Sequence, residues 1–246
     1  MKIKKHIPNA ITCLNLFCGC LAIVAAFENH LQLAAYLVGL AAIFDFCDGF
    51  AARMLRVTST IGKDLDSLAD MVTFGVVPGI VVFHYLEAIE GSMVPYTFIL
   101  TDYSWINYIA FLLVIFSAVR LAKFNNDPRQ SDSFIGLPTP ANAIFWCSLI
   151  FLEDSPVVLS LINPYSMIVG VILFSVLLIS EIPLFALKFR HFGWRGNRIR
   201  FSFLALSVLV LILLQETGVP LIIILYLVFS IIVDIASRRK RVPRTS

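Results

Sequence analysis

The sequence predicts an all-α membrane protein: a polytopic helical bundle of about eight transmembrane helices with both termini in the cytoplasm. Three observations predict this fold, namely the composition, the lengths of the apolar segments and the distribution of charge. Of the 246 residues, 59% are hydrophobic and 14% charged, and the mean hydropathy is +0.88. Soluble chains average about 45–50% apolar and about 25% charged residues. The apolar segments are also too long for the strands of an outer-membrane barrel, which alternate over about ten residues.

Eight segments are long enough to span a bilayer, whose apolar core of about 30 Å needs roughly twenty residues per helix. We expect these spans at residues 8–27, 32–56, 63–86, 104–123, 138–152, 165–187, 200–215 and 219–236. A basic stretch separates the last two spans from the others. The expected organisation is therefore a six-helix core (1–187), a basic cytoplasmic linker (188–199), and a C-terminal helix pair with a basic tail (200–246).

The charge distribution tests the number of spans. With eight spans and cytoplasmic termini, all 19 Lys and Arg residues fall on the cytoplasmic side. The outer loops then carry acidic residues such as Glu28 and Glu87 and no basic ones, as the positive-inside rule requires. One span more or fewer would scatter the basic residues to both sides. The net charge of +3 is too small to suggest a nucleic-acid partner, and we expect none.

Four aspartates lie within the expected second and third spans, where carboxylates are costly and usually face a cavity or a partner. Asp45 and Asp48 are three residues apart, and Asp66 and Asp70 are four apart, so each pair shares one helix face. Four carboxylates converging in a medium of low dielectric would repel one another unless cations offset their charge. Oxygen ligands alone suit Mg²⁺, Mn²⁺ or Ca²⁺, and two such ions can clamp a phosphoryl group.

The residues around these aspartates suit a phosphorylated ligand. Gly49 and Ala52 remove side-chain bulk, so a ligand can lie against the helix backbone. Arg53 offers a forked donor for phosphate. Gly62 opens the third helix, where the free N–H groups favour an anion. Together these features predict a site for a nucleotide pyrophosphate.

This segment resembles the signature of the CDP-alcohol phosphatidyltransferase family in every residue type and spacing. The pattern over 26 positions reads Asp45-x2-Asp48-Gly49-x2-Ala52-Arg53-x8-Gly62-x3-Asp66-x3-Asp70. The resemblance implies that the four aspartates hold two divalent metal ions, with Asp70 also the candidate base. It implies that Asp48, Gly49, Ala52, Arg53 and Gly62 line the CDP site. It further implies that an alcohol attacks the phosphate of a CDP-linked lipid and releases CMP, and that the protein is a homodimer.

Outside the signature, the chain is similar to the serine-using bacterial members of the family over nearly its first 145 residues. The similar stretches are 7–19, 67–78, 120–125 and 134–142. The resemblance implies transfer of the phosphatidyl group of CDP-diacylglycerol to L-serine, which gives phosphatidylserine. It also implies a multi-pass protein of the cytoplasmic membrane whose active site faces the cytoplasm.

Several polar residues have two readings. Asn9 and Thr12, with Asn15, either cap the first helix or face the nucleotide or the lipid headgroup. Arg120 with Asn125 is the best-placed group for an amino-acid carboxylate, although snorkelling to the basic side would also explain Arg120.

The residue Pro138, in the stretch 136–140, belongs either to a shaped turn or to the floor of the acceptor pocket. Other functions also stay open. The same chemistry could use glycerol phosphate or inositol phosphate as acceptor, and a cation-coupled transporter could use the same carboxylates as ion ligands. A purely structural membrane protein would gain nothing from four buried acids.

Overall fold

The structure, a computed structural model, is almost entirely helical. It describes residues 6–57, 59, 61–92, 104–127, 134–152, 162–184 and 197–241. The longer elements are α1 (His6–Phe27), α2 (Leu31–Leu55), α3 (Gly62–Asp70), α4 (Val77–Ser92), α5 (Phe111–Asn126), α6 (Thr139–Ser148), α8 (Pro164–Ile179), α9 (Arg198–Leu214) and α10 (Val219–Arg241). The shorter elements are η2 (Met71–Val76), η3 (Ser104–Ala110), η5 (Leu149–Leu152), η6 (Gln215–Gly218), and the strands β1 (Phe134–Ile135) and β2 (Pro183–Leu184).

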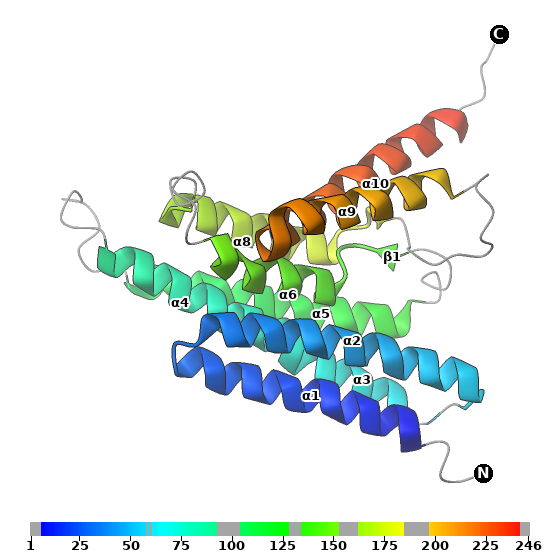
Figure 1. The fold of residues 1–246 in the computed structure, drawn as a ribbon, viewed down its shortest axis with the longest axis horizontal. Coiled ribbons are helices and arrows are strands. Elements are labelled where there is room, and N and C mark those ends of the chain that lie inside the picture. Colours follow the sequence, from blue (N-terminus) through cyan, green and yellow to red (C-terminus); the bar gives the residue numbers. More distant parts are fainter. Residues whose placement is uncertain are drawn as a thin grey trace.

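Five stretches of helix are long and apolar enough to cross a membrane, so the chain is a multi-pass membrane protein. They are His6–Phe27, Leu31–Leu55, Gly62–Ala88, Ile106–Asn126 and Ile199–Val233, and two shorter apolar helices cover Thr139–Leu152 and Pro164–Ile179. The last long stretch is not one straight rod, because the chain reverses at η6 and α9 and α10 pack side by side (Figure 1). A Cβ on Gly218 would lie 2.7 Å from Val210 Cγ1 and 3.1 Å from the Val210 carbonyl oxygen, so a larger residue at this reversal would push against α9.

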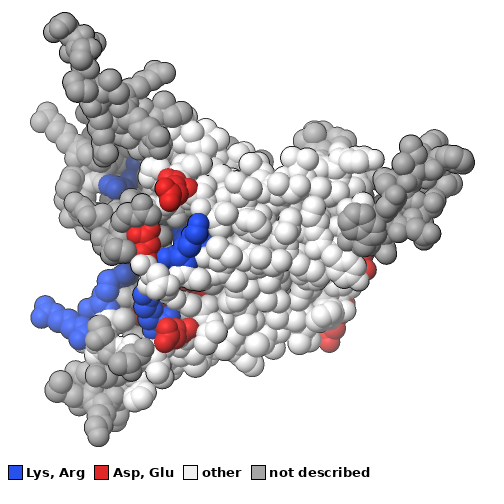
Figure 2. Space-filling view, turned by 180° about the vertical axis from the view of Figure 1, so that it is seen from behind, with Lys and Arg blue, Asp and Glu red and all other residues white. Residues whose placement is uncertain are grey.

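The two ends of the bundle differ in charge. Helix α1 begins and α10 ends at the same end of the bundle (Figure 1). On the face shown in Figure 2, the described Lys and Arg side chains gather at one end together with some acidic ones, and the charged side chains seen at the other end are all acidic. This polarity agrees with the predicted charge asymmetry. Lys2, Lys4, Lys5 and Arg129, and the part of the predicted linker from 188 to 196, lie outside the described residues.

Small residues bring the first two helices close together. Ala22 and Ala26 of α1 and Ala34 and Val38 of α2 are fully buried in the core, and α1 and α2 pack along their lengths (Figure 1). Small side chains let helix backbones approach closely, which favours association within a membrane. The two helices therefore form one closely packed side of the bundle.

The third predicted span is a single helix with a π-helical turn, η2, inserted between α3 and α4 directly after Asp70. Apolar length, from which this span was predicted, could not reveal this turn. It is pressed against α1, because a Cβ on Gly19 would lie 2.3 Å from Thr73 Oγ1. That hydroxyl donates to the carbonyl oxygen of Asn15 at 3.2 Å. The π turn thus fixes the position of Asp70 relative to α1.

The sixth predicted span is shorter than expected, and the prediction of helix as far as residue 187 is wrong. Helix α8 ends at Ile179, Ser180 is extended with ψ 153°, and β2 pairs antiparallel with β1. Pro183 lacks an N–H group and cannot continue a helix. Gly136, with φ 77°, donates from its N–H to the Ile182 carbonyl at 3.0 Å. This strand pair positions the segment that leads into α6.

Candidate functional site

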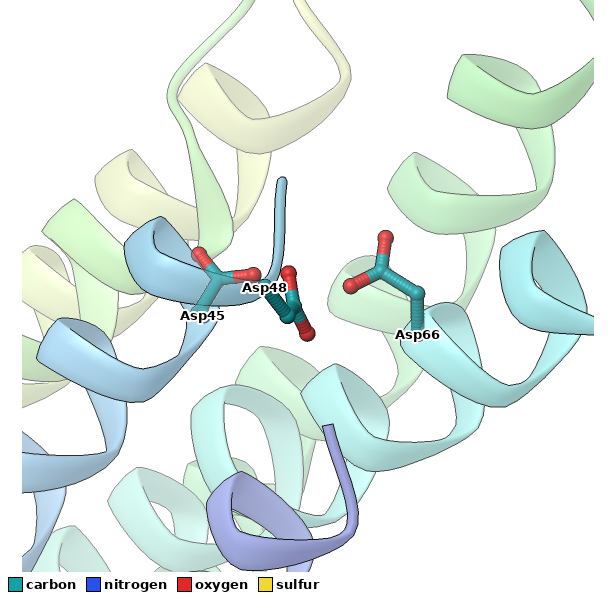
Figure 3. Close-up of side chains that lie close together, drawn as sticks. All are labelled: Asp45, Asp48 and Asp66. Carbon is teal, nitrogen blue, oxygen red and sulfur yellow. The ribbon is translucent and has the colours of Figure 1, made fainter. Parts of the chain in front are cut away.

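Three carboxylates from two helices converge on one point. Asp45 and Asp48 project from α2 and Asp66 from α3, and they turn toward one another (Figure 3). A carboxylate oxygen of each lies within 4.8 Å of one from both others. Grouped acids of this kind repel unless a cation lies among them. The donors are all hard oxygen atoms, so the group fits a divalent cation such as Mg²⁺ or Mn²⁺.

Asp70, one turn further along α3, does not belong to this group of three. Its side chain is buried, with 8% of its surface exposed. The amide Nδ2 of Asn15 donates to Asp70 Oδ1 at 3.1 Å. The sequence predicted that all four carboxylates converge, whereas the structure brings three together and places Asp70 outside that group.

A pocket of about 300 Å³ opens on one side of the carboxylates, between α1, α2 and α3. Its lining is made up of Pro8, Asn9, Thr12, Asp48, Gly49, Ala52, Val57, Ser59, Gly62, Lys63 and Asp66. We call it the nucleotide pocket, because it holds most of the residues predicted to bind CDP. Arg53 lies beside the pocket rather than in its lining: it is exposed, and its Nη1 is 4.0 Å from the position that a Cβ on Gly49 would take. Lys63 is a lining residue that the sequence did not single out.

Gly62 allows α1 and α3 to approach at this pocket. A Cβ there would lie 3.2 Å from Asn9 Oδ1 and 3.1 Å from Ser59 Cβ. Asn9 Nδ2 donates to Ser59 Oγ at 3.4 Å, so the side chain of Asn9 joins α1 to the segment before α3. Thr12 turns toward the carboxylates instead: its Oγ1 donates to Asp48 Oδ2 at 2.5 Å.

A second pocket, of about 230 Å³, lies on the other side of the carboxylates. It is lined by Asp45, Asp66, Asp70, Arg120, Leu121, Phe124, Pro138, Thr139 and Pro140, and we call it the acceptor pocket. Arg120 is 5% exposed, and its Nε donates to the Leu137 carbonyl at 2.5 Å. No other hydrogen bond or ion pair joins its guanidinium to the part of the chain that the structure describes. Arg120 and Pro138 thus line one pocket, as predicted.

Asn125 lies outside the acceptor pocket, contrary to the predicted pairing with Arg120. Its Nδ2 donates to Ser67 Oγ at 2.7 Å, and its carbonyl accepts a hydrogen bond from the ammonium group of Lys63. These contacts join the end of α5 to the start of α3. Asn125 is five residues from Arg120 on the same helix, a spacing that places the two side chains about 140° apart. The hydrogen bonds of Asn125 to Ser67 and Lys63 indicate that it links α5 to α3.

Asp66 lines both pockets. The two cavities therefore meet at the group of carboxylates, one reached from α1 and the other from α5 and α6. An arrangement of this kind can hold two different ligands on opposite sides of one reacting centre, since each ligand then presents its reactive atom to the same charged groups.

The comparisons with known proteins show the family of the chain. The model of the CDP-alcohol phosphatidyltransferase family matches residues 5–232. The chain belongs to the CDP-alcohol phosphatidyltransferase family, which is a family of transferases.

Among the relatives, the CDP-diacylglycerol–serine O-phosphatidyltransferase of Bacillus subtilis strain 168 is 34% identical over 188 residues, 76% of this chain and 91% of its own. The protein of the same name from Helicobacter pylori strain J99 is 35% identical over 149 residues, 60% of this chain and 58% of its own. The archaetidylserine synthase of Methanothermobacter thermautotrophicus is 32% identical over 141 residues, 56% of this chain and 54% of its own. The match thus spans less than two thirds of the Helicobacter and Methanothermobacter proteins.

Proposed function

We propose that this protein transfers the phosphatidyl group of CDP-diacylglycerol to the hydroxyl of L-serine, giving phosphatidylserine and CMP. One observation carries the choice of acceptor: a buried arginine, Arg120, whose terminal nitrogens have no hydrogen-bond or ion-pair partner among the described residues, lines a pocket that meets the carboxylates. The names of the bacterial relatives support the same reaction.

The nucleotide pocket suits the CDP half of the lipid. Gly49 and Ala52 leave the face of α2 open, and the start of α3 at Gly62 offers the positive end of a helix to the diphosphate. Lys63 in the lining and Arg53 beside it add positive charge. We assign Asn9, Thr12, Asp48, Gly49, Ala52, Arg53 and Gly62 to this site.

The acceptor pocket suits an amino acid better than a sugar phosphate or glycerol phosphate. A forked guanidinium can hold a carboxylate with two charge-assisted hydrogen bonds, and Arg120 is placed to do so. The ammonium group of serine would face the carboxylates of the same pocket. A dianionic phosphate would need several cations, and among the described lining residues Arg120 is the one cation. This favours serine over glycerol phosphate or inositol phosphate.

We assign two divalent cations, Mg²⁺ or Mn²⁺ or else Ca²⁺, to Asp45, Asp48, Asp66 and Asp70. The convergence of three carboxylates supports one cation position, and Asp70 is the additional ligand that a second would need. Bound there, the ions would neutralise the diphosphate and stabilise the charge that develops during transfer. The carboxylates themselves gain by binding, since their mutual repulsion is relieved.

The proposed reaction uses these residues as follows. Arg120 orients serine so that its hydroxyl faces the phosphorus atom attached to the diacylglycerol. Asp70, which lines the acceptor pocket, accepts the hydroxyl proton. The bond from the serine oxygen to phosphorus forms, the bridging bond of the diphosphate breaks, and CMP leaves through the nucleotide pocket. Most of the acceleration comes from positioning and charge stabilisation.

The membrane arrangement that we propose has eight spans, with both termini and both pockets at the cytoplasmic face of the cell membrane. The common end of α1 and α10 and the polarity of charge support an even number of crossings (Figures 1 and 2). We also propose that residues 1–187 form the catalytic core and that the protein is a homodimer, which mass measurement of the native particle tests.

The test is an acceptor comparison. Purified protein is incubated with CDP-diacylglycerol and Mn²⁺ together with serine, glycerol phosphate or inositol phosphate, and the lipid products are separated by thin-layer chromatography. We expect phosphatidylserine with an equal amount of CMP, and no lipid product from the other two acceptors. A phosphatidylglycerol phosphate or phosphatidylinositol phosphate product in place of phosphatidylserine would overturn the choice of serine.

A further inference from the structure

We propose that helix α1 orients the carboxylates of α2 and α3, with Thr12 as the positioning residue of Asp48 and Asn15 as that of Asp70. The inference deepens the proposed function, on which it rests for the role of the carboxylates as metal ligands. It also gives Thr12, which lines the nucleotide pocket, a second role as a support for a carboxylate.

The contact between Thr12 and Asp48 joins two helices through buried atoms. Thr12 is 4% exposed, and its hydroxyl has two acceptors, Asp48 Oδ2 at 2.5 Å and the Pro8 carbonyl at 3.1 Å. A hydroxyl has one proton to donate. The carboxylate is both nearer and charged, so it receives the stronger hydrogen bond. Thr12 thereby limits the rotation of the Asp48 carboxylate.

The contact between Asn15 and Asp70 repeats this arrangement one turn later on the same face of α1, because residues three apart share a helix face. Asn15 is fully buried, and its Nδ2 donates to Asp70 Oδ1 at 3.1 Å. Its main chain is fixed as well, since Thr73 Oγ1 of the π turn donates to the Asn15 carbonyl. One Asp70 oxygen is therefore occupied by α1, and the other is left for the acceptor pocket that Asp70 lines.

The two contacts matter because the carboxylates repel one another. Without donors behind them, flexible side chains would turn apart when no cation is bound, and each binding event would have to bring them together again. Donors in fixed positions keep the oxygen atoms in place. Changing such outer partners of metal ligands typically lowers metal affinity or activity about 10- to 100-fold.

The test measures Mn²⁺ binding without any reaction. Purified Thr12→Val, Thr12→Ser and Asn15→Leu proteins are titrated with Mn²⁺, and free Mn²⁺ is followed by its electron paramagnetic resonance signal. Thr12→Val and Asn15→Leu remove the donor at similar volume, and we expect each to weaken Mn²⁺ binding about 10-fold or more. Thr12→Ser keeps the hydroxyl, and we expect binding within about threefold of the parent. Leu14→Ala, on the exposed face of α1, is the matched control and should bind as the parent does.

Thermal unfolding of each variant separates positioning from misfolding, and Asn15→Ala replaces Asn15→Leu if the latter does not fold. Mn²⁺ affinity within about twofold of the parent in both Thr12→Val and the folded Asn15 variant overturns the inference, as does a parent protein that binds no Mn²⁺. Because no acceptor is present, the outcome is independent of the serine assay. If the acceptor comparison shows that serine is not the acceptor, the Mn²⁺ affinities of the variants still test the role of Thr12 and Asn15. If the variants bind Mn²⁺ as the parent does, the choice of serine is unaffected.

Discussion

Arg120 is anchored to the backbone of Leu137, because its Nε donates to the Leu137 carbonyl at 2.5 Å. This contact fixes the plane of the guanidinium and leaves its two terminal nitrogens for the acceptor pocket. Leu137 follows Gly136, whose positive φ and hydrogen bond to Ile182 belong to the short strand pair. The direction of the arginine fork is thus set by the segment between β1 and α6.

The first prediction concerns this fork. Arg120→Lys should raise the KM for serine and change the KM for CDP-diacylglycerol much less, because Lys presents one point charge in place of two parallel donors. Loss of a charged hydrogen bond costs about 1.5–3 kcal/mol, which corresponds to roughly a 10- to 150-fold change. Steady-state kinetics with each substrate varied in turn measures both constants. Lys123→Met, which removes an exposed charge from the same helix, is the control. Serine kinetics of Arg120→Lys within about twofold of the parent would show that Arg120 does not bind the acceptor.

The second prediction concerns Asp66, which lines both pockets and belongs to the group of three carboxylates. Asp66→Asn should lower CMP release by about two to three orders of magnitude, the usual cost of losing one group that stabilises transition-state charge. Chelation with EDTA should stop CMP release from the parent protein, and added Mn²⁺ should restore it. Asp64→Asn changes an exposed acid on the same helix and should stay active. Full CMP release from Asp66→Asn in metal-free buffer would contradict the assignment of metal ions to these carboxylates.

The third prediction concerns membrane topology. In a protein whose five native cysteines are replaced, Thr217→Cys in η6 should react with an impermeant maleimide added to sealed cells. Asn126→Cys at the end of α5 should react only after permeabilisation. Both residues are exposed, so accessibility within the fold is matched. Labelling of Asn126→Cys in sealed cells, or protection of Thr217→Cys, would contradict eight spans with cytoplasmic termini.

The fourth prediction concerns the packing of α1 on the π turn. Gly19→Ala places a Cβ 2.3 Å from Thr73 Oγ1, and overpacking of this kind costs about 1–3 kcal/mol. We expect a lower midpoint of thermal unfolding and reduced CMP release, since α1 also contacts the carboxylates. Gly39→Ala is the matched control, because no atom lies within 4 Å of its added Cβ. That variant should be as stable as the parent or more so, since Ala favours helix over Gly by about 0.5–1 kcal/mol. Equal unfolding midpoints for the two variants would refute the close-packing argument.

Much of the fold and part of the site could be predicted from the sequence, because long apolar segments and buried carboxylates are easy to recognise in a membrane protein. Apolar length gave the helices, and the fixed spacing of Asp45, Asp48 and Asp66 indicated carboxylates that the structure brings together. The resemblance also indicated the family, which the comparisons confirm. These features depend on local pattern, so no tertiary information was needed.

Other features depend on contacts between distant segments, which periodicity does not record. The separation of Asp70 from the other carboxylates requires Asn15, 55 positions earlier. The placement of Asn125 depends on Ser67 and Lys63 of another helix. Two errors had a visible signal. Pro183 argued against helix at the end of α8, and the spacing of five between Arg120 and Asn125 argued against a shared helix face.

The π turn after Asp70 decides which changes of length this segment can accept. A π turn holds about one residue more than an α turn, and one residue corresponds to a rotation of about 100° about the helix axis. A single deletion between Asp70 and Gly79 would let the π turn close into an α turn and would leave the helix beyond it facing the same way. An insertion, or the loss of two residues, would turn the helix beyond it by that angle, and Gly79 could then no longer face α5, where a Cβ on it would lie 2.5 Å from Val114 Cγ2. The segment should therefore tolerate the loss of one residue better than the gain of one.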